Sequence, residues 1–438
     1  MDFLEVFKKY QNDIIKHTIE LVSFRSVCVE NEVVDGVTYR FGIENKKALD
    51  YILNLGKEMG FKTHNVENVC GHIEYGEGKE LLAVLCHVDV VPAIGEWTKP
   101  PFECYEKDGK LYGRGTIDDK GPAITTLYAL KAIKDLGLPL QKRIRLIFGT
   151  DEESGSRGLE RYLEVMEKPK YGISPDANFP IIYGEKGILS IKFTGKNDSG
   201  ITAKGGVRLN VVAPFVDFET DNEDIKKLYK GKLHVEGISA HAMEPDNGRN
   251  AIREFALSVK PYVKSKFIDF ICDNLVNTRL KDCGLDITDK EMGDLTMNMG
   301  LLLMTKEEAC LAINIRYPHN LDYPKFISDF TDVAKKYGIT LEVISNSKPH
   351  YINPESPFIK KLHASYKKYT NDDTPLMTIG GGTYARDLEC GVAYGVNFPG
   401  EVEMAHETDE YATISSLMLA GTILMDAMYS LCKDKEWD

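Results

Sequence analysis

The sequence lacks the features that mark several large classes of protein. Its 54 Lys and Arg residues are outnumbered by 67 Asp and Glu residues, and the net charge of −13 argues against nucleic acid as a partner, because phosphate neutralisation needs a clustered basic surface. No apolar run approaches the ~20 residues that span a bilayer, and the N-terminal segment has neither a basic nor an apolar signal region. We therefore expect no membrane partner and a cytoplasmic location.

Paired cysteines and repeats are missing as well. The nine cysteines are scattered and form no Cys-x-x-Cys pair, a pattern typical of thiols in a reducing compartment rather than of a disulfide framework or a cysteine-bound zinc. What is present is ordinary globular composition, with 43% apolar and 28% charged residues. A chain of 438 residues has room for two or three domain-sized units.

Helical and strand-like segments alternate in the first part of the chain. Residues 3–23 have apolar side chains at helical spacing, and residues 81–86 form a continuous apolar run, as in a strand covered on both faces. A helix over 123–136, a strand over 143–148 and a helix over 157–166 are expected next. This alternation predicts an α/β fold with a mostly parallel sheet and helices on both faces.

The pattern changes from about residue 188. Strand-like segments at 188–193, 232–235 and 311–317, with a polar loop or surface helix at 220–231, are typical of an α+β module. The earlier pattern returns with a helix near 356–369, a strand at 392–398 and a long apolar helix over 409–431. We infer that one α/β domain, residues 1–186 and 353–438, is interrupted by an inserted α+β domain at 187–352.

Acidic residues and histidines follow several of the expected strands. The carboxyl ends of parallel strands meet at one edge of a sheet, where ligands bind. Each motif taken alone also fits a structural histidine or a solvated acidic turn, and the glycine-punctuated turn at 113–121 has a phosphate-binding loop as its rival interpretation, which its spacing and paired aspartates disfavour. The residues concerned are His87, Asp89, Asp118, Glu152, Glu153, Asp176 and His406.

Together these residues predict a metal centre. Like charges brought into one cleft cannot all stay ionised unaided, and two divalent cations with His87 and His406 as imidazole ligands relieve that repulsion. A two-metal site also needs a bridging carboxylate and a general base that is not a ligand. Glu152 and Glu153, adjacent in sequence, can divide the base and ligand roles.

The same motifs resemble a known family, the co-catalytic zinc exopeptidases and deacylases that include carboxypeptidase G, aminoacylase and succinyl-diaminopimelate desuccinylase. The match is carried by His87-x-Asp89, Gly115-x-x-Asp118-x-Lys120-Gly121, Asp151-Glu152-Glu153, Asp176 and His406. Within the family the chain is most similar to bacterial dipeptidases, through Trp97-Thr98-x-Pro100-Pro101-Phe102, Ile315-Arg316-Tyr317-Pro318 and Gly380-Gly381-Gly382-Thr383-Tyr384.

The resemblance implies a role for each site residue. Asp118 would bridge the metals and form a cis peptide with Asp119, and Glu152 would be the general base. His87 and Asp176 would complete one metal's shell, Glu153 and His406 the other's, with Asp89 orienting His87. In the inserted domain, which resembles the family's lid, His241 would stabilise the oxyanion. The implied substrate-binding residues are Asn210, Arg316, Gly381, Gly382 and Tyr384.

These roles imply a metal-dependent dipeptidase that acts on small peptides with a free C-terminal carboxylate. Zinc is the implied metal, and Mn²⁺ or Co²⁺ suits the same ligands. The large inserted domain implies a monomer, with a dimer as the alternative. Two other functions stay open: an N-acyl amino acid deacylase or desuccinylase of the same family, and a non-enzymatic metal-binding or interaction protein on a retired hydrolase scaffold, against which the complete catalytic set argues.

Overall fold

The computed structural model describes all of the 438 residues except residues 1, 436 and 438. The chain forms two compact units. The first contains the residues up to Tyr183, Ile352–Met377 and the residues from Thr383 on, and the second contains Gly184–Tyr351 and Thr378–Gly382. The sequence suggested an insertion at 187–352; in the structure the short segment 378–382 also belongs to the second unit, so the chain passes between the units four times.

The first unit is built around a sheet with strands in the order β23-β9-β5-β8-β4-β3. The four strands from β23 to β8 run parallel, β4 runs antiparallel to β8, and β3 runs antiparallel to β4. All seven residues of β5 are buried, as expected for an apolar strand covered on both faces. The strands of this sheet are β3 (Lys62–Val66), β4 (Cys70–Tyr75), β5 (Leu81–His87), β8 (Arg143–Gly149), β9 (Tyr171–Ser174) and β23 (Cys390–Ala393).

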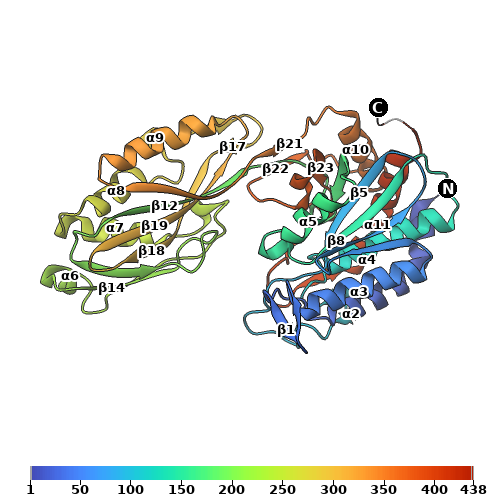
Figure 1. Ribbon diagram of the computed structural model, residues 1–438, viewed down its shortest axis with the longest axis horizontal. Helices are drawn as coiled ribbons and strands as arrows, with labels where there is room; N and C mark the ends of the chain where they lie inside the picture. Colours follow the sequence, from blue (N-terminus) through green and yellow to red (C-terminus); the bar gives the residue numbers. More distant parts are fainter. Residues whose placement is uncertain (1, 436, 438) are drawn as a thin grey trace. The chain divides into compact units, whose positions relative to one another are not determined.

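Helices cover both faces of this sheet (Figure 1). On one face α5 packs against Leu85 and Ile147. Ile73, whose partner on β8 is Leu146, points to the opposite face and lies against Gly56 of α3. The helices of the first unit are α1 (Phe3–Phe7), α2 (Gln11–Val22), α3 (Ile43–Glu58), α4 (Lys120–Asp135), α5 (Arg157–Val165), α10 (Pro357–Thr370) and α11 (Ile414–Cys432), with short 3₁₀ turns η1 (Lys8–Tyr10), η2 (Glu152–Ser154) and η6 (Tyr384–Asp387).

Short strand pairs complete the first unit. β1 pairs with β2, β10 pairs with β24, and a three-stranded sheet has the order β25-β7-β6. Their bounds are β1 (Glu32–Val34), β2 (Val37–Tyr39), β6 (Tyr105–Lys107), β7 (Lys110–Tyr112), β10 (Ala177–Asn178), β24 (Val396–Asn397) and β25 (Tyr411–Thr413). Strands β11 (Ile182–Glu185) and β22 (Met377–Ile379) carry the chain across the boundary between the units.

The second unit is an antiparallel α+β module. Its seven-stranded sheet has the order β15-β14-β13-β18-β19-β12-β20. The strands are β12 (Gly187–Lys196), β13 (Ile201–Gly205), β14 (Phe215–Thr220), β15 (His234–Glu236), β18 (Thr296–Met304), β19 (Glu308–Tyr317) and β20 (Thr340–Ser347). The helices are α6 (Glu223–Leu228), α7 (Ala251–Val259), α8 (Lys266–Asn274) and α9 (Tyr323–Lys335), and the short elements are η3 (Pro245–Asn247), η4 (Lys260–Tyr262), η5 (Lys281–Cys283), β16 (Thr288–Asp289), β17 (Gly293–Asp294) and β21 (His350–Tyr351).

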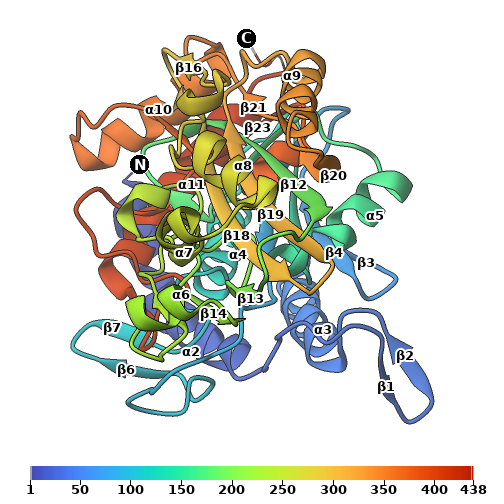
Figure 2. The same ribbon diagram turned by 90° about the vertical axis from the view of Figure 1, so that its left-hand side faces the viewer.

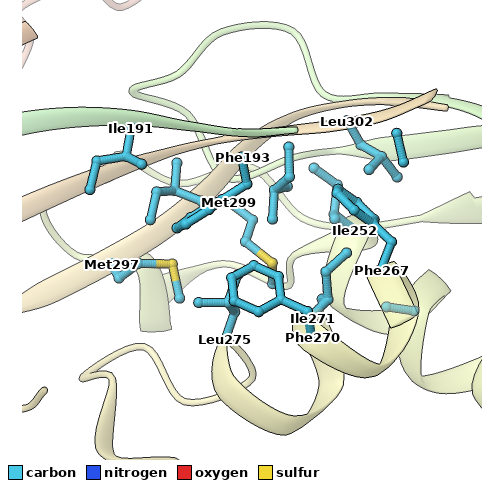
Figure 3. Packing of buried hydrophobic residues seen from close by; sticks show 14 of the residues in the cluster. Ile191, Phe193, Ile252, Phe267, Phe270, Ile271, Leu275, Met297, Met299 and Leu302 are labelled. Carbon is cyan, nitrogen blue, oxygen red and sulfur yellow. The ribbon is translucent and has the colours of Figure 1, made fainter. Parts of the chain in front are cut away.

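Helices of the second unit lie against its sheet (Figure 2), and an apolar core fills the space between them (Figure 3). Phe193 of β12 is fully buried, and its ring centroid lies 4.9 Å from that of Phe270 on α8 and 5.1 Å from that of Phe330 on α9. Figure 3 shows Phe193 and Met299 pointing from the strands toward Phe270 and Ile271. Burial of such side chains, at about 1.5–3 kcal/mol each, stabilises the second unit.

The C-terminal helix corrects two expectations. Residues 411–413 form β25, which pairs with β7, so α11 begins at Ile414 and not at residue 409. No segment apolar enough to span a bilayer was expected from the sequence, but α11 is long and apolar enough by length and composition. Its apolar window is 67% buried within the protein, as in a core helix, and it contacts α4 and α10.

Candidate functional site

The parallel strands of the first unit end beside one another and place polar residues at one edge of the sheet. Strand β5 ends at His87, and β8 ends at Gly149, directly before the turn η2 that carries Glu152 and Glu153. Strand β9 ends at Ser174, two residues before Asp176. Because β5 pairs in parallel with both β8 and β9, these residues lie close together.

Two groups of side chains with metal-ligating atoms meet at this edge. In the first, Nε2 of His87 lies 3.0 Å from Oδ1 of Asp118 and 3.4 Å from Oδ2 of Asp176. In the second, Nε2 of His406 lies 3.1 Å from Oδ2 of Asp118 and 2.9 Å from Oε1 of Glu153. Within each group the ligand atoms lie within 4.8 Å of one another. Asp118 contributes one carboxylate oxygen to each group and thereby joins them.

The turn that carries Asp118 depends on local backbone geometry. Gly115 has φ +93°, a conformation that L side chains rarely adopt, and a Cβ at Gly121 would lie 2.1 Å from the carbonyl oxygen of Thr116. The peptide bond between Asp118 and Asp119 is cis. Oδ2 of Asp119 accepts a hydrogen bond from the backbone N–H of His87 at 3.0 Å, which ties this turn to the end of β5.

Asp89 contacts both His87 and the turn that carries Glu152 and Glu153. Its carboxylate oxygens accept hydrogen bonds from the backbone N–H groups of Glu152 and Glu153, each at 3.1 Å. The Nδ1 atom of His87 lies 3.0 Å from the carbonyl oxygen of Asp89 and 3.4 Å from its Oδ1. Asp89 therefore holds the turn that carries the two glutamates in addition to facing the imidazole.

Asp151 has a structural part in the same turn. Its Oδ1 accepts a hydrogen bond from the N–H of Gly158 at 2.8 Å, and its Oδ2 accepts one from the N–H of Arg157 at 3.0 Å. These are backbone donors in the first turn of α5, which have no partner within the helix itself. Asp151 thus fixes η2 against α5, and the acidic run at 151–153 is not a solvated surface segment.

The electrostatics of the cluster are unfavourable for carboxylates alone. Burial, reinforced by the neighbouring Asp118, raises the pKa of Glu153 to about 7 and that of Asp176 to about 6. Burial also raises the pKa of Glu152 well above its usual range. Burial acts to lower the pKa of His87, but its carboxylate neighbours, Asp176 first, raise it well above the ordinary value.

The donor set fits divalent cations. Carboxylate oxygens and imidazole nitrogens are ligands that Zn²⁺, Mn²⁺ and Co²⁺ accept, and a cation supplies the positive charge that several buried carboxylates require. The two imidazoles already point their Nε2 atoms at shared carboxylate oxygens. Glu152 belongs to neither ligand group among the described residues, whereas its neighbour Glu153 belongs to one.

Other residues that the sequence analysis selected lie near this cluster or in the second unit. The ring of Tyr384 lies edge-on to that of His87, with centroids 6.3 Å apart. In the second unit, the exposed residues Asn210 and His241 are brought together, because the N–H of Ala242 donates to the carbonyl oxygen of Asn210 at 2.9 Å. Arg316 is buried and donates from Nη1 to the carbonyl oxygen of Gly380 at 2.8 Å, which places it beside the segment that continues through Gly381 and Gly382.

Two residues that contact the site, Arg114 and Glu410, have no role predicted from the sequence. Nη1 of Arg114 donates to Oε2 of Glu410 at 2.6 Å, and both side chains are buried. They flank the motifs that carry Asp118 and His406. The only sequence sign of the pair is that two opposite charges stand beside those motifs. No local pattern shows that residues 296 positions apart in sequence pair with each other.

Comparison with known proteins identifies close sequence relatives. Residues 83–430 match the sequence profile of peptidase family M20/M25/M40. The chain is 37% identical over 465 residues to a Bacillus subtilis (strain 168) protein named “Putative dipeptidase YtjP”, covering 98% of this chain and 99% of that protein. A relative with the same descriptive name from Staphylococcus aureus (strain USA300) is 35% identical over 468 residues, with the same coverage.

Solved structures share the fold at low sequence identity. A dipeptidase of Saccharomyces cerevisiae, Dug1p, matches with a TM-score of 0.64 and 13% identity and covers 99% of both chains. Human carnosine dipeptidase 1 matches with a TM-score of 0.62 and 16% identity, over 98% of this chain and 97% of that one. These matches support the fold, an α/β unit interrupted by an inserted α+β unit.

Proposed function

The chain belongs to peptidase family M20/M25/M40, and we propose that it is a metal-dependent dipeptidase that cleaves dipeptides with a free C-terminal carboxylate. The observation that carries this proposal is the pair of ligand groups joined by Asp118. The names of the sequence relatives, which call them dipeptidases, support the substrate class. The chain is proposed to work as a monomer.

We assign the metal ligands by these contacts. His87, Asp118 and Asp176 would hold one divalent cation, and Asp118, Glu153 and His406 a second, with Zn²⁺ proposed ahead of Mn²⁺ and Co²⁺. Such ions, when bound, lower the pKa of water toward ~7 and polarise a carbonyl group. Asp89 orients His87 and fixes the backbone of Glu152 and Glu153, so that the ligands and the base keep their relative positions.

Glu152 is proposed to be the general base. Its carboxylate takes a proton from the attacking water at one oxygen and delivers it to the nitrogen of the leaving amine. Two observations support this role: its side chain is no member of the ligand groups in the described chain, and burial raises the pKa of its carboxyl, which makes it a stronger base than an exposed glutamate.

The second unit is proposed to bind the rest of the substrate. The exposed imidazole of His241 would donate to the oxyanion, with Asn210 as its neighbour. Arg316 would pair with the C-terminal carboxylate, and Gly381 and Gly382 would offer backbone N–H groups to the same anion. Tyr384 would contact the substrate from the first unit.

A substrate panel tests this function. Metal-stripped protein is titrated separately with Zn²⁺ and Mn²⁺ and assayed on dipeptides, tripeptides, C-terminally amidated dipeptides and N-acyl amino acids. The proposal expects metal-dependent cleavage of free dipeptides and loss of activity on the amidated forms, because the amide removes the anion that Arg316 would bind. Faster cleavage of N-acyl amino acids than of dipeptides would establish the deacylase alternative instead.

A further inference from the structure

A buried ion pair between Arg114 and Glu410 lies outside both ligand groups. The side-chain exposures are 2% for Arg114 and 0% for Glu410, and Nη1 of the arginine lies 2.6 Å from Oε2 of the glutamate. Removing two charges from water is costly, and a buried pair of this kind is often no more stabilising than apolar residues of the same volume. Its contacts therefore point to something besides stability.

Glu410 holds the turn that carries Asp118. Its Oε1 accepts hydrogen bonds from the backbone N–H groups of Gly115 at 2.9 Å, Ile117 at 3.0 Å and Asp118 at 3.4 Å. Three donors converging on one carboxylate oxygen fix the path of the turn, and charge-assisted hydrogen bonds of this kind are stronger than neutral ones. The backbone of Asp118 is thus anchored directly to Glu410.

Arg114 contacts the segment that carries His406. Its Nη2 donates to the carbonyl oxygen of His406 at 3.2 Å, while its Nη1 is bound to Glu410. The guanidinium also lies over the ring of Trp97, 5.1 Å from its centroid, which restricts its rotation. One planar group therefore links the segment of His406 to the carboxylate that anchors Asp118.

We propose that Glu410, together with Arg114, is a positioning residue that sets the spacing between Asp118 and His406 and so tunes the affinity of the site for divalent cations. The proposal rests on the metal-dependent function proposed above. Groups that hydrogen-bond behind metal ligands typically change metal affinity by about 10–100-fold when they are replaced. Here the contacts are made to the backbone of Asp118 and His406. A shift of that backbone would move the whole ligand side chain.

The test is the metal affinity of Glu410→Gln in the metal-free protein, measured by competition with a chelator of known affinity for Zn²⁺ and Mn²⁺. The amide keeps the size of the carboxylate but loses its charge and turns one acceptor into a donor, which must face either Arg114 or the N–H groups of the turn. We expect the dissociation constant to rise about 10–100-fold. Activity should return toward the wild-type value when the metal concentration is raised in proportion.

The matched control is Glu74→Gln. Glu74 pairs with Arg145 at 2.6 Å in the same unit, with side-chain exposures of 12% and 5%, and contacts neither ligand group. We expect this variant to lower thermal stability and to leave the dissociation constant of the metal unchanged. A purely structural role for Glu410 predicts the same result in both variants, whereas a positioning role separates them.

Each outcome bears on one proposal. Wild-type protein that binds neither metal overturns the proposed function. If the wild-type protein binds metal and the Glu410→Gln variant binds it with the same dissociation constant, the positioning role alone is overturned. If Glu410→Gln does not fold, Arg114→Lys is measured in its place: an ammonium group keeps the charge but cannot span Glu410 and His406 in the same planar arrangement, so weaker metal binding is again expected and unchanged binding contradicts the proposal.

Discussion

The two units differ in how closely their buried ionisable groups gather. At the carboxyl edge of its sheet the first unit encloses His87, Asp89 and Asp119, each with 1% exposure or less. The second unit has an apolar core cluster, and of the residues proposed to act from this unit Asn210 and His241 are exposed and Arg316 is buried. The first unit thus gathers ionisable groups that the proposed cations would neutralise, whereas the core of the second unit is formed by apolar side chains. Substitutions in the metal centre of the first unit should therefore change metal binding or turnover. Substitutions in the core of the second unit should change the free energy of unfolding.

The largest expected effect is loss of turnover in Glu152→Gln. Removing the proton acceptor while keeping all five proposed ligands should lower kcat by roughly 10²–10⁴-fold. Metal content, measured by elemental analysis, should not change. Glu160→Gln on the exposed side of α5 is the control and should keep full activity. A Glu152→Gln variant with wild-type kcat would remove Glu152 from the mechanism.

Phe193→Ala tests whether the apolar core of the second unit is independent of the metal centre. Truncating this fully buried ring should cost about 3–5 kcal/mol of unfolding free energy, because it leaves a cavity between β12, α8 and α9. Denaturant unfolding measures the loss, and the half-exposed Ile344→Ala should change stability by no more than about 0.5 kcal/mol. Weakened metal binding by folded Phe193→Ala protein would contradict the separation of the two units.

His241→Ala tests the catalytic contribution of the second unit. Loss of an oxyanion donor should lower kcat by roughly 10²–10³-fold with unchanged metal affinity. His234→Ala replaces another exposed histidine of the same unit, one that pairs with Asp217, and should be neutral. Equal activity of the two variants in a steady-state assay would confine the chemistry to the first unit.

The smallest effect concerns a buried histidine of the first unit outside the metal centre. Burial, with the nearby Arg145 charge, lowers the pKa of His72 from 6.5 to about 3. Between these two values the unfolded chain binds a proton that the folded protein does not, so stability falls as the pH drops from about 6.5, by up to about 1.4 kcal/mol per pH unit. His72→Gln should flatten this part of the stability curve, measured by denaturant unfolding, and an unchanged curve would exclude His72 as its source.

The sequence was informative where local pattern and topology coincide. The apolar run at 81–86 predicted a buried strand, and the carboxyl-end rule then indicated that residues after β5, β8 and β9 would meet, because those strands are parallel neighbours. The structure brings His87, Asp118, Glu153, Asp176 and His406 together; their roles as ligands stay predictions that metal-binding measurements can test.

Features that depend on pairing between distant segments were not predictable. Residues 378–382 join the second unit through contacts such as the hydrogen bond from the N–H of Lys186 to the carbonyl oxygen of Ile379. No local sequence pattern predicts this contact. Tyr411–Thr413 continue the apolar helical pattern but form β25, because β7 offers backbone partners there. The Arg114–Glu410 pair likewise became visible only once the chain was folded.

The position of β23 has a consequence for the order of events during synthesis. This strand lies between β9 and β11 in the sheet, yet it is one of the last to be made. Residue 393, which pairs beside residue 174, leaves the ribosome roughly 220 residues later, or about 11–44 s at the usual elongation rates. Until then one edge of β9 has no strand beside it, and exposed strand edges are where chains pair wrongly. A nascent chain of this protein thus spends much of its synthesis with an open sheet, a period in which chaperone binding would protect it most.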